Sequence, residues 1–246
     1  MTPHPPAREA VAVQKGRDGE AAQAVVSSLT KRALAVAIAF AALGAGIGAY
    51  VAVYLTAAPP PLAAAQTPAG VQLYVATVPA AGPLASHPTW VSYYRVDAQS
   101  HHWRHTTTWV VPAHALVHVT IYQYDSSTGL RNPFLSEVAG TVGGVMMLNG
   151  KAVRAVSPDA PAHTFAIPQL GVSVPLPGVS DNAKNPCGQA PCSLSNAHET
   201  ISFTFRAPGR GLYRWQCFVP CAAGFIQGNG GPMQTIGYMG GFIKVV

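Results

Sequence analysis

Three side chains stand at spacings that suit a soft-metal site. His163 lies just ahead of an apolar run in the sequence PAHTFAIP, and Cys217 and Cys221 are four residues apart in YRWQCFVPC. Imidazole and thiolate ligands together favour copper or zinc over calcium or magnesium. A β-sandwich gathers copper ligands in this way, with one histidine at a strand end and cysteines in a late loop. Copper chemistry is therefore the first hypothesis for this chain.

The segments around these residues have patterns that would bring them together. We expect strands over Thr164–Val174, directly after the histidine, over Leu212–Cys217 and over Gly240–Val246. Both cysteines then fall on the loop that joins the last two strands. The imidazole and the two thiols are expected to meet at one pole of the domain.

Further segments also read as strands. They are Val71–Pro79, Thr89–Val96, Trp109–Tyr124 and Glu199–Arg206, and the last alternates apolar and polar residues throughout its length, ETISFTFR. The chain contains 24 glycines and 22 prolines, and only 10% of its residues are charged, which argues against a helical bundle. Seven or eight short strands between turns predict an all-β fold, a Greek-key β-sandwich or barrel.

An uncharged apolar segment precedes these strands. Ala33–Ala58 is long enough to span a bilayer. Lys31 and Arg32 flank it on the N-terminal side and no lysine or arginine follows until Arg95, so the N-terminus is expected in the cytoplasm. The predicted organisation is a disordered cytoplasmic segment over 1–32, a single-pass transmembrane helix over 33–58, a linker over 59–70 and an extracytoplasmic domain over 71–246. A secretory signal cleaved near residues 63–65 is the alternative, although the apolar regions of such signals are shorter.

The remaining chemistry-bearing residues favour structural roles. Cys187 and Cys192 close the short loop CGQAPC and are predicted to form a disulfide in an oxidising compartment. The histidines of SHHWRH, at 101, 102 and 105, could form a surface metal site, but a polar strand or turn is the favoured interpretation. The net charge of +6 comes from scattered lysines and arginines, so we expect no nucleic-acid partner.

Three stretches carry a resemblance to a known family. PAHTFAIPQLGVSVPLPG, ETISFTFRAPGRGLYRWQCFVPCAAG and GGFIKVV resemble the exported cupredoxin domain of cytochrome c oxidase subunit II, in its version with one membrane helix. The resemblance covers roughly Trp109–Val246, with inserts around Asp125–Asp159 and Asp181–Asn196. It implies a cupredoxin-like fold behind the anchor.

The resemblance also implies ligands. It places the first ligand histidine at His163, the two bridging cysteines at Cys217 and Cys221, and a backbone carbonyl ligand at Val219. It places aromatic residues used in electron entry near Trp103 and Trp109, but the spacing fits poorly and favours core packing.

The loop departs from the family pattern after the second cysteine. The family has a histidine four residues later and a methionine three residues beyond that, where this chain has Phe225 and Gly228. Met233 and Met239 come later, in a longer, glycine-rich loop. One hypothesis is therefore a mononuclear copper site with the ligands His163, Cys217, Cys221 and Met233. The alternative is a disulfide between the two cysteines, with Phe225 filling the ligand gap.

The function implied by the resemblance is that of an oxidase subunit. The chain would dock on a haem-bearing membrane subunit, in the lipid bilayer, and relay electrons if copper binds. Without copper it would support the complex structurally. It would be at most an electron-transfer subunit. Two alternatives stay open, a stand-alone anchored copper or electron carrier and a non-catalytic binding module.

Overall fold

The computed structural model describes residues 7–55, 61–79, 90–97, 100–221, 231–233 and 235–246. It divides into two compact units, Met1–Ala52 and Val53–Val246. The first is helical and the second is built of strands.

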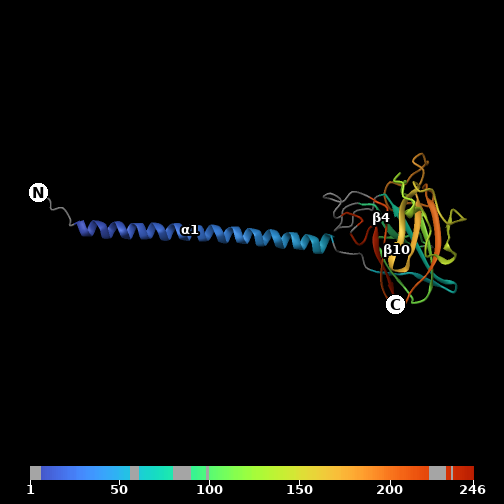
Figure 1. Ribbon diagram of the computed structural model, residues 1–246, viewed down its shortest axis with the longest axis horizontal. Coiled ribbons are helices and arrows are strands. Elements are labelled where there is room, and N and C mark those ends of the chain that lie inside the picture. Colours follow the sequence, from blue (N-terminus) through green and yellow to red (C-terminus); the bar gives the residue numbers. More distant parts are fainter. Residues whose placement is uncertain (1–6, 56–60, 80–89, 98–99, 222–230, 234) are drawn as a thin grey trace. The chain divides into compact units, whose positions relative to one another are not determined.

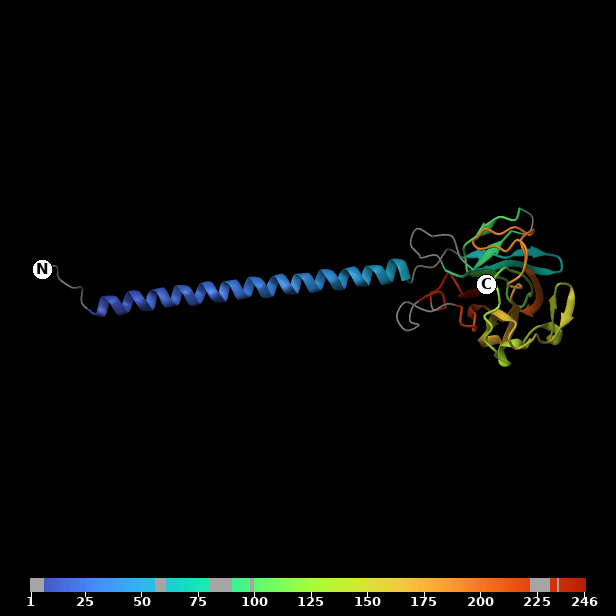
Figure 2. The same cartoon turned by 90° about the horizontal axis from the view of Figure 1, so that it is seen from above.

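The N-terminal unit is one long helix. Helix α1 runs over Ala7–Tyr50 and continues as one π-helical turn, η1, over Val51–Leu55. Figures 1 and 2 show α1 as one uninterrupted rod. Its part Ser27–Val53 is long and apolar enough to cross a membrane, a property that a membrane anchor and an N-terminal signal sequence share.

The helix begins earlier than the sequence pattern suggested. Residues 1–32 were expected to lack structure, whereas the structure is helical from Ala7 onward. The stretch AREAVAVQKGRDGEAAQAVV has no proline and is rich in alanine, glutamate and glutamine, which have high helix propensity. Local propensity continues the helix even though this stretch has no pattern that would pack a core.

The second unit contains two β-sheets (Figure 1). The described strands of the first sheet, in spatial order, are β1 (Leu62–Ala63), β6 (Thr108–Val111), β14 (Gly240–Val245), β13 (Gly211–Gln216), β10 (Pro161–Ile167) and β11 (Val172–Pro177). Strand β14 pairs in parallel with β6 and antiparallel with β13. The C-terminal strand therefore lies in the middle of this sheet.

The second sheet is the larger one. Its described strands, in spatial order, are β5 (Trp103–Arg104), β4 (Ser92–Val96), β3 (Gly70–Val78), β7 (Leu116–Gln123), β12 (Glu199–Arg206), β8 (Met146–Leu148) and β9 (Lys151–Val153), and β2 (Ala65–Thr67) pairs with β3. The pairing of β3 with β7 is parallel and that of β12 with β7 is antiparallel. The predicted all-β fold, with two sheets and one N-terminal apolar helix, is thus confirmed.

The core lies between the sheets. Alternate residues of β7 and β12 are buried, including Val119, Ile121 and Phe203, as period-two patterning predicts. Trp109 and Trp215 stack with ring centroids 4.7 Å apart. This aromatic pair joins β6 to β13, so it braces the strand that leads into the cysteine loop.

Two predicted strands are each two strands in the structure. Trp109–Tyr124 breaks after Val111, and its halves β6 and β7 lie in different sheets. Proline at 112 and the positive φ of His114 (62°) form the corner. Thr164–Val174 breaks at the 3-10 turn Pro168–Leu170, where Gly171 adopts a left-handed conformation, so β10 and β11 form a hairpin.

The expected linker and the first insert both contain regular elements. Residues 62–67 of the expected linker form β1 and β2, so the domain begins before residue 71. The insert over 125–159 contains the 3-10 turns η2 (Phe134–Ser136) and η3 (Val142–Gly144) and the hairpin β8–β9. Met146 is buried and Met147 is 36% exposed, as expected for neighbours on opposite faces of a strand.

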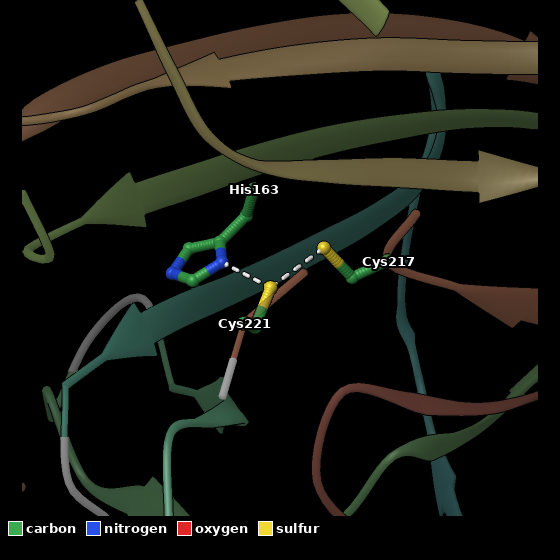
Figure 3. Close-up of side chains that lie close together, drawn as sticks. All are labelled: His163, Cys217 and Cys221. Carbon is green, nitrogen blue, oxygen red and sulfur yellow. Dashed lines mark hydrogen bonds between the residues drawn. The ribbon is translucent and has the colours of Figure 1, made fainter. Parts of the chain in front are cut away.

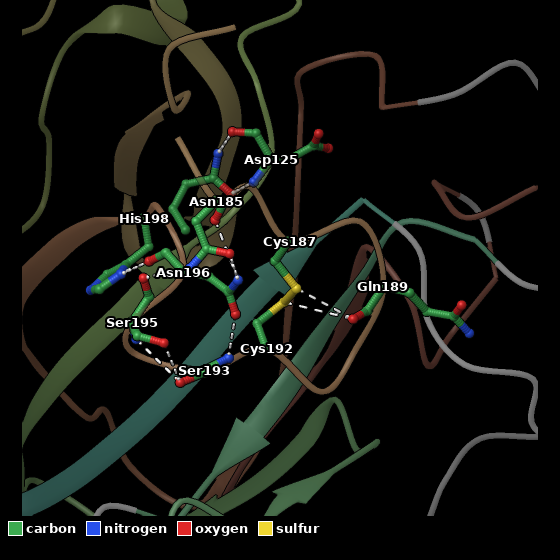
Figure 4. The surroundings of a disulfide bond; sticks show 10 residues. Asp125, Asn185, Cys187, Gln189, Cys192, Ser193, Ser195, Asn196 and His198 are labelled. Carbon is green, nitrogen blue, oxygen red and sulfur yellow. Dashed lines mark hydrogen bonds between the residues drawn. A yellow bond between two sulfur atoms is a disulfide. The ribbon is translucent and has the colours of Figure 1, made fainter. Parts of the chain in front are cut away.

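The predicted disulfide between Cys187 and Cys192 is present (Figure 4). Asn185 and Asn196 hold the two sides of its loop together, through a side-chain hydrogen bond of 3.2 Å. Around it lie Tyr94, Tyr124 and Tyr238, which form a second, smaller apolar cluster with the two cysteines. The disulfide is therefore a structural cross-link that lies outside the main core.

Candidate metal centre

The structure brings the three predicted ligands together. His163 lies on β10, and Cys217 and Cys221 lie on the loop that follows β13 (Figure 3). The Nδ1 atom of His163 is 2.9 Å from the Sγ atom of Cys221, which is 3.0 Å from the Sγ atom of Cys217. All three ligand atoms lie within 4.8 Å of one another. The distant segments thus converge as expected.

Backbone pairing fixes the first cysteine. Cys217 directly follows β13, whose Gln216 pairs with Ala166 of β10 and with Gly240 of β14. The Cys217 N–H donates to the carbonyl oxygen of Met239 at 2.8 Å. Cys217 is therefore positioned by the strands on either side of β13, and its side chain is fully buried.

The neighbour of the histidine supports the cysteine loop. The N–H of Thr164 points at the Cys217 sulfur at 3.3 Å, and the Thr164 hydroxyl accepts the N–H of Phe218 at 2.8 Å. An amide hydrogen bond to sulfur stabilises a thiolate. One residue thus links the strand of the imidazole to the loop of the thiols.

The two sulfur atoms differ in their acidity. Burial raises the pKa of Cys217, but hydrogen bonds from Cys221 and His163 outweigh it and hold that pKa well below its ordinary value. Burial and the neighbouring charge on Cys217 raise the pKa of Cys221. The negative charge is therefore favoured on Cys217 over Cys221, whose Sγ atom also lies 2.9 Å from the carbonyl oxygen of Val219.

A carboxylate on the far side orients the imidazole. The Nε2 atom of His163 lies 3.2 Å from the Oδ2 atom of Asp125. Burial lowers the pKa of His163, but the hydrogen bond with Asp125 and the charge on Cys217 outweigh it and raise the pKa to about 9. With Nε2 occupied by the carboxylate, Nδ1 is the atom presented to the sulfur pair.

Sequence reasoning missed Asp125, which it placed only at the start of an irregular insert. The side chain of Gln123 bonds both the carbonyl oxygen and the N–H of Asp125, at 2.7 and 3.0 Å, and the N–H of Val179 donates to the same carbonyl at 2.9 Å. The end of β7 therefore positions this carboxylate. The only sequence signal was an acid just after a strand end.

These residues fit a copper ion. The set combines one imidazole nitrogen and two sulfurs, and the Val219 carbonyl oxygen lies 2.9 and 3.5 Å from the two sulfurs. Thiolate and imidazole donors suit copper, and a weak backbone oxygen ligand is compatible with electron-transfer copper sites. Cys217 and Cys221 are free cysteines in the structure rather than the alternative disulfide.

The other predicted ligand stays a prediction. Met233 is half-buried and, like Cys221, packs against the core cluster that contains Cys217. Met239 is fully buried, beside the backbone of Cys217. Phe225 and Gly228, which stand where the family has its remaining ligands, lie outside the described residues.

Two other histidines serve the fold. His118 contacts the hydroxyl of Thr204 at 2.8 Å on the outer face of the second sheet. His105 contacts the hydroxyl of Ser92 at 2.8 Å and stacks on Tyr94. Trp109 belongs to the core, as expected from its poor match to the family spacing. Among the described residues, the His–Cys–Cys group is the one cluster of metal-binding character.

An apolar groove lies beside the centre. Its cavity volume is about 530 Å³, and it is lined by residues of η2, β10 and β11 together with Phe218. Phe218 is 43% exposed and Phe134 is 81% exposed. Because Phe218 directly follows Cys217, this groove reaches to the backbone of the candidate ligand loop.

Comparisons with known proteins found likeness at the level of structure. No family model matches the chain, and no curated protein matches it by sequence. Among solved structures, a copper protein rusticyanin is similar with 14% identity, covering 82% of this chain and 93% of the other at a TM-score of 0.31. Rusticyanin from Thiobacillus ferrooxidans has the same identity, coverage of 82% and 92%, and a TM-score of 0.31. Reduced rusticyanin is 17% identical, with coverage of 74% and 88% and a TM-score of 0.26.

Proposed function

We propose that this chain is a membrane-anchored, cupredoxin-like electron-transfer protein that holds copper between His163, Cys217 and Cys221. The observation that carries the proposal is the convergence of one imidazole nitrogen and two free sulfurs within 4.8 Å, from segments more than fifty residues apart. Apolar side chains would pack this buried position better than an imidazole and two thiols. The cluster is therefore better explained by metal binding than by packing.

The protein residues around the ion would favour rapid electron exchange. Bound copper would supply a one-electron redox couple. The loop is held by the Cys217–Met239 backbone hydrogen bond and by Thr164, so its ligands need to move little between oxidation states. Asp125 fixes the ring of His163, as carboxylates do for histidine ligands elsewhere.

The finer proposal is an oxidase subunit. The resemblance of residues 109–246 to cytochrome c oxidase subunit II supports a haem-bearing membrane subunit as partner. In this proposal α1 is an uncleaved anchor in the cell membrane, with its N-terminus in the cytoplasm and the β-domain outside. The groove beside Phe218 offers an apolar surface close to the copper for contact with a redox partner.

The test of copper binding uses the full-length chain in neutral detergent, purified with copper present. The visible spectrum and the count of titratable thiols are recorded together. We expect intense thiolate-to-copper absorption, lost in Cys217→Ser and retained in His118→Gln, a histidine substitution on the outer face. A metal-free sample without titratable thiols contradicts the proposal, because it would contain a second disulfide.

The test of the oxidase partner is separate. The tagged full-length chain is purified from its native membrane in mild detergent and the eluate is examined for haem absorption. Co-purifying haem in stoichiometric amount supports the subunit proposal. A copper-loaded chain that elutes without haem contradicts it and favours a stand-alone electron carrier.

A further inference from the structure

A basic pocket lies among the strands that follow the apolar helix. Its cavity volume is about 250 Å³. The lining residues are Leu62, Ala63, Ala65, Arg95, Asp97, His102 and Arg104. No ligand of the candidate metal centre lines it, so it is a second site to be explained.

Two arginines face each other in this pocket. Arg95 of β4 and Arg104 of β5 are direct cross-strand partners in antiparallel register. Like charges directly opposite one another on neighbouring strands destabilise a sheet. The arrangement is favourable if an anion bridges the two guanidinium groups, because arginine forks match phosphate oxygens.

Arg95 is a buried lining residue with one unpaired donor. Its side chain is only 6% exposed, and its Nη1 atom donates to the carbonyl oxygens of Tyr74 (2.9 Å) and Val96. Its Nε atom is buried and has no hydrogen-bond partner among the described residues. A buried unpaired donor of a charged group is costly, so the described residues leave this guanidinium incompletely satisfied.

Asp97 compensates only part of this charge. Burial lowers the pKa of Arg95 and the Asp97 carboxylate opposes that shift. The Oδ1 atom of Asp97 is engaged by the N–H and the hydroxyl of Ser100, at 2.7 and 2.9 Å. With two arginines against one carboxylate, the net charge of the pocket is positive. The His102 ring is a further polar group in it.

We propose that this pocket binds a phosphate group through Arg95 and Arg104, and that the phosphate is that of a phospholipid headgroup or free phosphate. Three of the lining residues are Leu62, Ala63 and Ala65. In the sequence they come only a few positions after Leu55, where the apolar helix ends. A membrane phosphate is thus one source, and the inference does not depend on copper.

The experiment uses the full-length chain in neutral detergent. One arm titrates inorganic phosphate by calorimetry, and the other measures retention of phosphatidylglycerol against diacylglycerol by native mass spectrometry. The substitution Arg104→Gln is expected to weaken binding about tenfold, the loss of one charged hydrogen bond. Arg104→Lys keeps part of the affinity, and Arg210→Gln, an exposed arginine in the β12–β13 turn, leaves it unchanged.

A gain of binding gives an independent check. Asp97→Asn removes the competing carboxylate and is expected to tighten phosphate binding in whichever arm shows it. Selective retention of phosphatidylglycerol identifies the lipid as the source, and calorimetric binding without lipid retention identifies free phosphate. The proposal is overturned if neither arm shows binding, or if Arg104→Gln binds as tightly as Arg210→Gln.

Discussion

His163 is held between a carboxylate and a sulfur, with Nε2 at 3.2 Å from Asp125 and Nδ1 at 2.9 Å from Cys221. This relationship gives the imidazole one orientation and presents a defined nitrogen to the sulfur pair. A metal-binding histidine is commonly fixed by such a partner on its other ring nitrogen. The relationship makes Asp125 part of the centre although it is not a ligand.

Removing the charge of Asp125 tests its role. Asp125→Asn keeps the size of the side chain but replaces the charged hydrogen bond to His163 Nε2 with a weaker one. Copper affinity is therefore expected to fall about 10-fold to 100-fold. The measurement is competition against a chelator of known affinity, with Asp181→Asn as the matched control on the exposed surface. Equal affinities of the two variants would show that the carboxylate does not position the ring.

Thr164 is expected to stabilise the cysteine loop. Thr164→Val removes the hydroxyl that accepts the Phe218 N–H, at a cost of about 1 kcal/mol in the free energy of unfolding. Urea unfolding measures this cost, and Thr120→Val on the outer face of β7 is the control. If both substitutions have the same small effect, the hydroxyl does not hold the loop.

Gly241 is required by close packing of backbones. A Cβ atom there would lie 1.8 Å from the carbonyl oxygen of Thr107, which accepts the Phe242 N–H. Gly241→Ala is expected to destabilise the domain by about 3 kcal/mol, since the parallel pairing of β14 with β6 must shift. Gly209→Ala has nothing within 4 Å of its added atom and serves as the control. A thermal midpoint unchanged by Gly241→Ala would contradict the pairing.

The pH dependence of metal-free stability follows from two opposed shifts. His163 has its pKa raised from 6.5 to about 9, so its contribution is complete below pH 6.5 and is lost as the pH rises to 9. Cys217 has its pKa lowered, so its contribution is present above the ordinary value of 9.0 and declines as the pH falls below it.

Below pH 9 the two contributions have opposite signs in the native chain. The fall in the free energy of unfolding toward pH 9 is therefore expected to be shallower than the roughly 1.4 kcal/mol per pH unit of one uncompensated group. Cys217→Ser removes the cysteine contribution and also the hydrogen bond and charge of Cys217 that help to raise the pKa of His163. The histidine contribution is then expected to be lost at a lower pH than in the native chain, with a slope of at most about 1.4 kcal/mol per pH unit. Denaturant titrations at several pH values measure both slopes. A histidine contribution that is lost at the same pH in Cys217→Ser as in the native chain would contradict this assignment of charges.

The strand ranges were predicted best where the alternation of apolar and polar residues in the sequence matches the alternation of buried and exposed residues in the structure. The range of β12, Glu199–Arg206, is as predicted, because its alternation matches one buried and one exposed face. The range Trp109–Tyr124 was predicted as one strand and is two. The break depends on a corner that carries the chain from one sheet to the other, and residue propensity alone does not encode that corner.

The candidate site was predictable in its ligands but not in its support. His163 and the cysteine pair are identifiable because ligand chemistry restricts residue type and the loop between two strands restricts position. Asp125 is 38 residues before His163 in the chain, and its contact depends on how the end of β7 is held by Gln123. Such a contact arises from tertiary packing and leaves no local pattern.

X-ray absorption at the copper edge of the full-length, copper-loaded chain tests the central claim most directly. The account predicts one copper per chain with sulfur and imidazole scattering, sulfur scattering reduced in Cys221→Ser and imidazole scattering lost in His163→Gln. A spectrum with only oxygen and nitrogen neighbours, or a chain that retains no copper while its two cysteines stay reduced, would contradict it.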